Sequence, residues 1–109
     1  MKKGEIWLVD LSDSKGHEQK GERPAIVIGS AYSLITVVPL TTNMKLANFS
    51  HTLPMEPTKE NGLTEHSVAL VFQLTSLDQI RFKTKMGLAC KEHIDEIDQL
   101  LLEFLKLAT

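Results

Sequence analysis

Short runs of strand-forming residues, separated by turn-forming residues, occupy most of this chain and restrict its fold more than any other feature. Runs this short that are rich in Val, Ile, Leu and Thr favour β-strands over helices. Strands are expected over 6–11, 24–29, 34–38, 68–74 and within 82–90, with a weaker edge strand over 51–55. Lys59–Gly62 has the composition of a tight turn. Such a set of strands predicts a β-barrel or a curled sheet.

The C-terminal segment has a different period. Its apolar residues recur three or four positions apart, which is typical of an amphipathic helix that packs on a core. They are Ile94, Ile97, Leu101, Phe104, Leu105 and Ala108. Acidic residues dominate the first turns and Lys106 lies near the end, as the helix dipole favours. The chain is therefore expected to be mainly β with one C-terminal helix.

Length and composition indicate one domain, residues 1–109, with 42% hydrophobic residues. No apolar run reaches the length of a membrane span, so no membrane association is expected. The N-terminus leads into the first strand without the apolar core of a signal peptide, which predicts a cytoplasmic protein. Cys90, the single cysteine, excludes an internal disulfide and is expected to be a buried apolar residue.

The net charge of −2 is unevenly distributed along the chain. Residues 91–109 carry two lysines against five acidic residues, a net −3, and the rest carries ten basic against nine acidic residues, a net +1. The acidity therefore lies on the C-terminal segment, and the remainder is compatible with a local basic surface for nucleic acid.

The polar loop before the second strand holds most of the residues that could carry chemistry. His17, Glu18, Gln19, Lys20 and Arg23 lie close together among glycines. Two interpretations stay open at this point. The side chains form a solvated loop, or they supply a base, an acid and an anion-binding group at one site.

Three other groups of residues are candidate sites. Thr41, Thr42 and Asn43 follow an apolar strand, where they satisfy the backbone of a turn or donate to a phosphate. The histidines match no familiar zinc spacing, so no metal site is expected. Arg81, Lys83 and Lys85 are explained by a solvated strand face.

The order of these segments resembles the MazF/PemK family of toxins. Gly4–Leu11, then Gly16–Gln19, then Gly21–Ile28, follow the N-terminal signature of that family, and Pro39–Thr42 matches its Pro-x-Thr-Thr strand end. The resemblance implies an SH3-like, partly open β-barrel with a C-terminal helix, paired as a homodimer. It also implies a toxin that cleaves single-stranded messenger RNA sequence-selectively, without a metal or another cofactor. The implied partner is an antitoxin whose acidic, disordered tail folds over the RNA groove.

The family's functional residues map onto positions of this chain. Arg23, Thr41 and Glu18 match catalytic positions or positions tied to activity. The residues expected to contact RNA are His17, Gln19, Lys20, Thr42, Asn43 and Gln73. Trp7 matches an aromatic residue with a packing role. The choice of proton carrier between Glu18 and His17 stays open.

One departure concerns the later strand, where some relatives carry an acid, a Gln and then a basic residue. Gln73 is present, but Phe72 replaces the acid and Thr75 the basic residue. The departure puts any mechanism that needs the later acid in doubt, and it leaves two alternatives on the same fold. One is a gyrase inhibitor like CcdB, and the other is a catalytically degenerate module that binds RNA or antitoxin.

Overall fold

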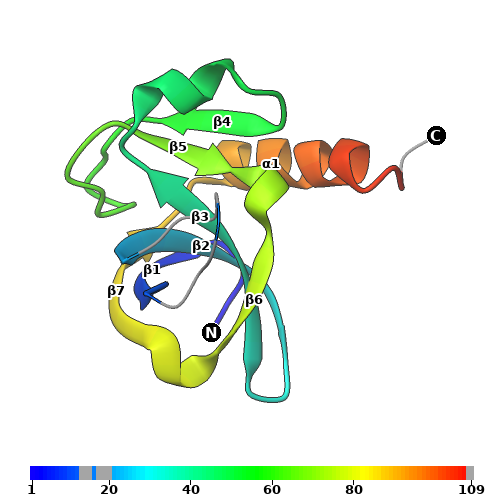
Figure 1. The fold of residues 1–109 in the computed structure, drawn as a ribbon. Coiled ribbons are helices and arrows are strands. Elements are labelled where there is room, and N and C mark those ends of the chain that lie inside the picture. Colours follow the sequence, from blue (N-terminus) through cyan, green and yellow to red (C-terminus); the bar gives the residue numbers. More distant parts are fainter. Residues whose placement is uncertain (13–15, 17–20, 108–109) are drawn as a thin grey trace.

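The computed structural model describes residues 1–12, 16 and 21–107, and Figure 1 shows their arrangement. The strands are β1 (Glu5–Asp10), β2 (Glu22–Ala31), β3 (Leu34–Thr41), β4 (Thr52–Met55), β5 (Ser67–Leu70), β6 (Thr75–Asp78) and β7 (Phe82–Leu88). One helix, α1 (Lys91–Phe104), follows them, and three 3-10 turns lie between strands, η1 (Met44–Asn48), η2 (Val71–Gln73) and η3 (Gln79–Arg81).

The strands pair antiparallel in the order β4-β5-β3-β2-β1-β7, and β6 pairs with β3. β3 changes partners along its length. Its first part pairs with β2 and β6, whereas its last two residues, Leu40 and Thr41, pair with Ala69 and Val68 of β5. A strand that passes from one set of partners to another bends the sheet around the core. The sheet curls without closing, which confirms the predicted partly open barrel.

Both faces of the central strands are buried. Ile26 of β2 and Val38 of β3 face a cluster that includes Ile97 and Leu101 of α1. Their neighbours Val27 and Val37 point to the opposite face and join a second cluster. Side chains alternate between the faces of a strand, so strands covered on both faces need nearly continuous apolar runs. This requirement explains why the sequence predicted β2 and β3 so directly.

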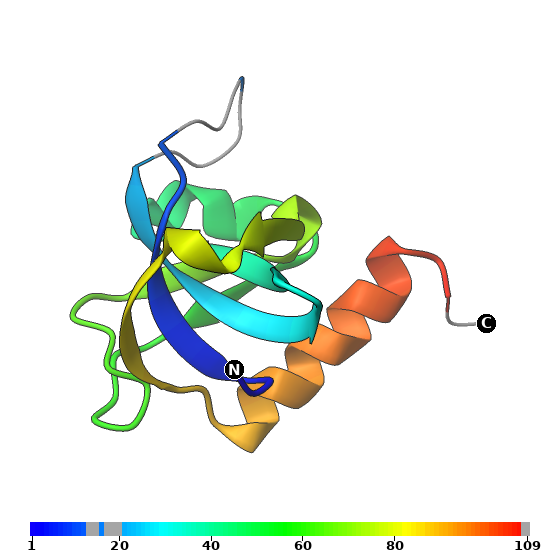
Figure 2. The ribbon, with the colours of Figure 1, turned by 90° about the horizontal axis from the view of Figure 1, so that it is seen from below.

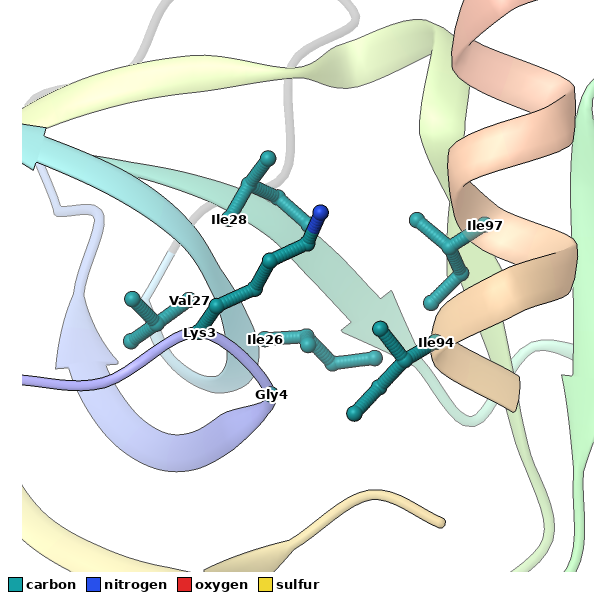
Figure 3. Close-up of a pocket in the computed structure, with 7 residues that line it drawn as sticks. All are labelled: Lys3, Gly4, Ile26, Val27, Ile28, Ile94 and Ile97. Atoms are coloured by element: carbon teal, nitrogen blue, oxygen red, sulfur yellow. The ribbon is translucent and has the colours of Figure 1, made fainter. Parts of the chain in front are cut away.

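The N-terminal half of α1 packs against the start of the chain and against β2. Figure 3 shows Ile94 and Ile97 pointing toward Ile26, around a gap that is also lined by Lys3, Gly4, Val27 and Ile28. The gap is too small to admit a water molecule. A Cβ atom at Gly4 would crowd Ile94 Cδ1 at 2.5 Å, so the chain passes closest to the helix at a glycine. The gap is a packing space and carries no ligand.

The predicted apolar stripe of the helix is only partly correct. Ile97 and Leu101 are buried, but the helix ends at Phe104, and Leu105 and Leu107 are exposed. Lys106 adopts a left-handed conformation (φ 58°), and the N–H of Leu107 donates to the carbonyl of Leu102 at 2.9 Å. This pattern closes a helix and turns the chain away from it. Ala108 lies outside the described residues.

Two other predictions were wrong. The strand expected over 68–74 ends at Leu70, because the chain turns into η2, where the N–H of Leu74 donates to the carbonyl of Val71. Cys90 is exposed at the N-cap of α1 and is not a core residue.

The edge strand expected at 51–55 is confirmed as β4, which lies at one end of the strand order. None of the helices among the described residues is long and apolar enough to span a membrane.

A buried charge joins β1 to β7. Trp7 Nε1 donates to Glu5 Oε1 at 2.9 Å, and Lys85 Nζ lies 3.2 Å from Glu5 Oε2. The hydrogen bond from Trp7 lowers the pKa of Glu5 most strongly, and Lys85 lowers it further, whereas burial acts in the opposite direction. The Trp7 ring meets the edge of Phe82 with their centroids 6.0 Å apart. Trp7 therefore has the packing role implied for it.

Candidate active site

Arg23 and Thr41 lie at the same end of the pair formed by β2 and β3. Ala25 and Pro39 are partners in this pair, and Arg23 and Thr41 each lie two residues beyond them. Extending the register therefore places the two residues opposite each other, where β3 leaves β2 to join β5. Since side chains alternate along a strand, both project from the face that carries Val27 and Val37. The fold therefore places an arginine and a threonine from two neighbouring strands at the same end of the sheet.

Thr41 is nearly enclosed, with 5% of its surface exposed. Its Oγ1 accepts a hydrogen bond from the backbone N–H of Asn43 at 3.2 Å. The Asn43 side chain in turn accepts from the N–H of Lys45 at 3.2 Å and caps η1. The backbone-satisfying role of this segment is therefore present in the structure. It is compatible with a donor role as well, because a hydroxyl that accepts one hydrogen bond still carries a hydrogen to donate.

Arg23 and Gln73 are both half-buried, and both make interactions with the rest of the protein. Gln73 is the last residue of η2, two residues before Thr75, which pairs with Val37 of β3. It therefore lies beside the part of β3 that leads to Thr41. Thr42 and Asn43 follow Thr41 directly and are exposed. These predicted RNA-contact residues lie along one end of β3.

The other predicted site residues, His17, Glu18, Gln19 and Lys20, lie outside the described residues. The base of their loop is described. The N–H of Leu11 donates to the carbonyl of Gly21 at 2.8 Å, which holds the two ends of the loop together. Asp10 Oδ1 accepts from the N–H of Ser12 at 2.8 Å, and the hydrogen bonds from Ser12 lower the pKa of Asp10. The loop therefore starts and ends beside the strand that carries Arg23.

The basic cluster has a structural explanation. Lys83 and Lys85 are exposed on β7, and Lys85 pairs with Glu5. Asp78 Oδ1 accepts from the N–H of Ile80 at 3.0 Å and caps η3, so Arg81 ends a capped turn. Within the described part of the chain, no three His, Cys, Asp or Glu residues lie together as metal ligands would.

The structure also contains a surface that the sequence did not reveal. Phe49, Ser50, His51, Phe72 and Phe104 line a groove of about 330 Å³, here called the aromatic groove. The rings of Phe49 and Phe72 lie 6.1 Å apart, and those of His51 and Phe104 5.4 Å apart. Phe104 belongs to the helical stripe, His51 and Phe72 lie in segments where strands are expected, and Phe49 lies outside every expected element. Only the tertiary fold brings them together.

Comparisons with known proteins identify the family of the chain and its fold. Residues 2–105 match the family described as PemK-like, MazF-like toxin of type II toxin-antitoxin system. The chain is 31% identical to the endoribonuclease MazF of Staphylococcus epidermidis over 106 residues, which cover 93% of this chain and 88% of that protein.

Two solved structures share the fold. MazF from Deinococcus radiodurans superposes with a TM-score of 0.82 at 24% identity, covering 97% of this chain and 96% of that one. MazF in a MazE–MazF structure from the same organism superposes with a TM-score of 0.77 at 22% identity, covering 99% and 97%. With the family match over nearly the whole chain and the relative above 30% identity, the chain belongs to the PemK-like, MazF-like family of toxins of type II toxin–antitoxin systems.

Proposed function

We propose that this protein is the toxin of a type II toxin–antitoxin system and a metal-independent endoribonuclease that cuts single-stranded messenger RNA at selected sequences. The placement of Arg23 and Thr41 at one end of β2 and β3 carries the proposal. The proposal is also supported by the family of this chain and by its 31% identity to an endoribonuclease MazF. Residues 1–109 act as one domain in this scheme. Messenger RNA as the substrate places the activity in the cytoplasm.

RNA supplies its own nucleophile, the 2′-hydroxyl, so the reaction does not require a metal-bound water. The 2′-oxygen attacks the adjacent phosphorus, the bond to the 5′-oxygen breaks, and the products are a 2′,3′-cyclic phosphate and a 5′-hydroxyl. The reaction needs a group that removes the 2′-proton, a group that protonates the 5′-oxygen, and donors for the developing negative charge.

Arg23 suits the stabilising role, because a guanidinium donates two parallel hydrogen bonds to phosphate oxygens. Its pKa above about 12 makes proton transfer by this group unfavourable. Thr41 donates a further hydrogen bond to the same phosphate. The proton carrier is Glu18 or His17, and an imidazole has the more suitable unperturbed pKa. Gln19, Lys20, Thr42 and Gln73 contact the RNA, whose bases are read unstacked.

Incubation of the purified protein with a long single-stranded RNA in excess EDTA tests this proposal. Discrete cuts that end in 5′-hydroxyl groups are expected, and a DNA of the same sequence should resist cutting because it lacks the 2′-hydroxyl. Mapping the ends also defines the recognition sequence. If the folded protein leaves all RNAs intact, the nuclease proposal fails, and gyrase inhibition by a CcdB-like mechanism becomes the next assay. Cuts that depend on added metal would disprove the mechanism.

We also propose that two copies pair through the aromatic groove. Phe49 is 55% exposed, Phe104 37% and Leu107 68%, and exposed apolar surface of this kind marks an interaction site. Figure 2 shows that the last turns of α1 extend beyond the strands. In a pair related by a twofold axis, each copy presents the same surface to the other. The projecting helix end of one copy then covers the groove of its partner.

Light scattering during gel filtration tests the pairing. The wild type should have about twice the chain mass of 12.2 kDa, whereas Phe104→Glu should elute as a monomer. Introducing a carboxylate into a desolvated apolar contact costs several kcal/mol. Ile80→Glu is the matched control, since Ile80 is exposed on η3, in another part of the molecule. A Phe104→Glu protein that stays dimeric would place the interface elsewhere.

The antitoxin is the remaining partner. One solved structure that shares the fold is an endoribonuclease in complex with its cognate antitoxin, and another is a MazE–MazF structure. For this chain we propose an antitoxin with an acidic, disordered tail that folds over the Arg23–Thr41 end of the sheet and competes with RNA by charge.

A further inference from the structure

We propose that Asn43 is a positioning residue for RNA cleavage. In this proposal its side chain fixes the turn after β3, and the fixed turn holds the Thr41 hydroxyl as a hydrogen-bond donor toward the scissile phosphate. The inference rests on the proposed function and extends it, because it assigns Asn43 a role that acts through Thr41 and not through direct contact with RNA.

The first step concerns the hydroxyl itself. A threonine hydroxyl carries one hydrogen and two acceptor positions, and it rotates to suit its neighbours. The N–H of Asn43 occupies one acceptor position of Thr41 Oγ1, at 3.2 Å. The hydroxyl hydrogen therefore points away from this N–H group. Because Thr41 is 5% exposed, few water molecules compete for its orientation, and the local backbone sets the direction of donation.

The second step concerns what holds that N–H in place. Asn43 adopts an extended conformation (φ −75°, ψ 94°), and its Oδ1 accepts from the N–H of Lys45 at 3.2 Å. The carbonyl of Asn43 accepts from the N–H of Leu46 at 3.1 Å, which forms the first turn of η1. Asparagine is among the best residues at this capping position, and alanine is among the poor ones. Without the side-chain acceptor, the turn loosens, and the N–H that orients Thr41 moves with it.

The third step separates this role from direct RNA contact. Serine at position 43 keeps a cap acceptor but lacks the amide group, whereas alanine lacks both. A positioning role predicts that serine restores what alanine removes. A direct contact through the amide predicts that the two substitutions cause the same loss, expressed mainly in KM.

The experiment measures kcat and KM for cleavage of a short single-stranded RNA by the wild type, Asn43→Ala and Asn43→Ser. We expect Asn43→Ala to lower kcat about tenfold with KM nearly unchanged, because a misplaced catalytic group lowers the rate, and Asn43→Ser to stay within about twofold of the wild type because it keeps the cap. Asn48→Ala is the control, because Asn48 is exposed at the other end of η1 and should leave kcat unchanged.

Amide hydrogen exchange at Lys45 gives a readout that does not depend on cleavage. Protection should fall in Asn43→Ala and return in Asn43→Ser. Equal losses of kcat in both variants, or a change in KM alone, would overturn the positioning role while the nuclease proposal stands. Unchanged protection of the Lys45 amide from exchange in Asn43→Ala would also overturn the positioning role. If the wild type cuts no RNA, the proposed function itself fails, and the positioning role fails with it.

Discussion

Arg23→Ala should lower kcat for cleavage of single-stranded RNA by about 100- to 1000-fold, which corresponds to roughly 3–4 kcal/mol of lost transition-state stabilisation. Arg23 is at the end of the sheet where β3 separates from β2, opposite Thr41 in the extended register. Its removal takes away a guanidinium, which can donate two parallel hydrogen bonds to phosphate oxygens. Arg23→Lys should recover part of the loss, because an ammonium keeps the charge without the planar fork.

The comparison needs a variant that loses one positive charge elsewhere. Lys83→Ala serves this purpose, since Lys83 is exposed on β7 and the proposed mechanism does not use it. We expect Lys83→Ala to cut RNA at nearly the wild-type rate, apart from a small change in binding at low salt. Single-turnover cleavage assays and circular dichroism on all four proteins complete the test. An Arg23→Ala protein that is folded and fully active would show that the phosphate charge is stabilised by another group.

The fold and the site differ in how much of each could be predicted from the sequence. β2 and β3 were predicted because strands buried on both faces need nearly continuous apolar residues, and such runs are visible in one sequence. The 3-10 turns η2 and η3 have no comparable signal, since three residues are too few to establish a period. The strand expected over 68–74 was therefore extended across η2.

The site depends on contacts between distant parts of the chain. A family resemblance points to Arg23 and Thr41 as site residues, but only the register of β2 against β3 shows that they share a face and an end of the sheet. Phe49 and Phe72 are separate aromatic residues in the sequence, and their contact depends on where η1 and η2 lie in the fold. Cys90 was expected in the core because its neighbours are apolar, whereas its place before α1 leaves it exposed.

A similar difference between local signal and tertiary role occurs at Asn61–Gly62, which was predicted only as a turn. Asn61 is 2% exposed, and its side chain makes hydrogen bonds that hold its loop together. Its Oδ1 accepts from the N–H groups of Thr58 and Leu63, and its Nδ2 donates to the carbonyl of Glu56. The same loop covers the edge of the sheet, because the N–H of Leu88 donates to the carbonyl of Glu60 at 2.8 Å. An edge strand covered in this way is protected from pairing with other chains.

Gly62→Ala should therefore be among the most destabilising single substitutions in the protein. Gly62 has φ +70°, and a Cβ atom there would overlap the backbone carbonyl of Met86 in β7. The left-handed conformation alone costs an alanine about 1–2 kcal/mol. Relief of the overlap requires the loop to move away from β7. This movement breaks the hydrogen bond between Leu88 and Glu60 and disturbs the hydrogen bonds of the Asn61 side chain. We expect a total loss of about 4 kcal/mol or more in the free energy of unfolding, a large share of the roughly 5–15 kcal/mol of a typical domain.

Gly21→Ala separates the two contributions. Gly21 has φ +77°, but no atom of the described residues lies within 4 Å of the position of its Cβ atom, so alanine there meets only the conformational cost of about 1–2 kcal/mol. Urea unfolding followed by Trp7 fluorescence, at one fixed protein concentration because pairing also affects stability, measures both variants. If Gly62→Ala loses no more stability than Gly21→Ala, the loop moves away from Met86 without cost. The cover over β7 would then contribute little to the fold. A loss at Gly62 several times larger would show that the close backbone contact between this loop and β7 holds the edge of the sheet.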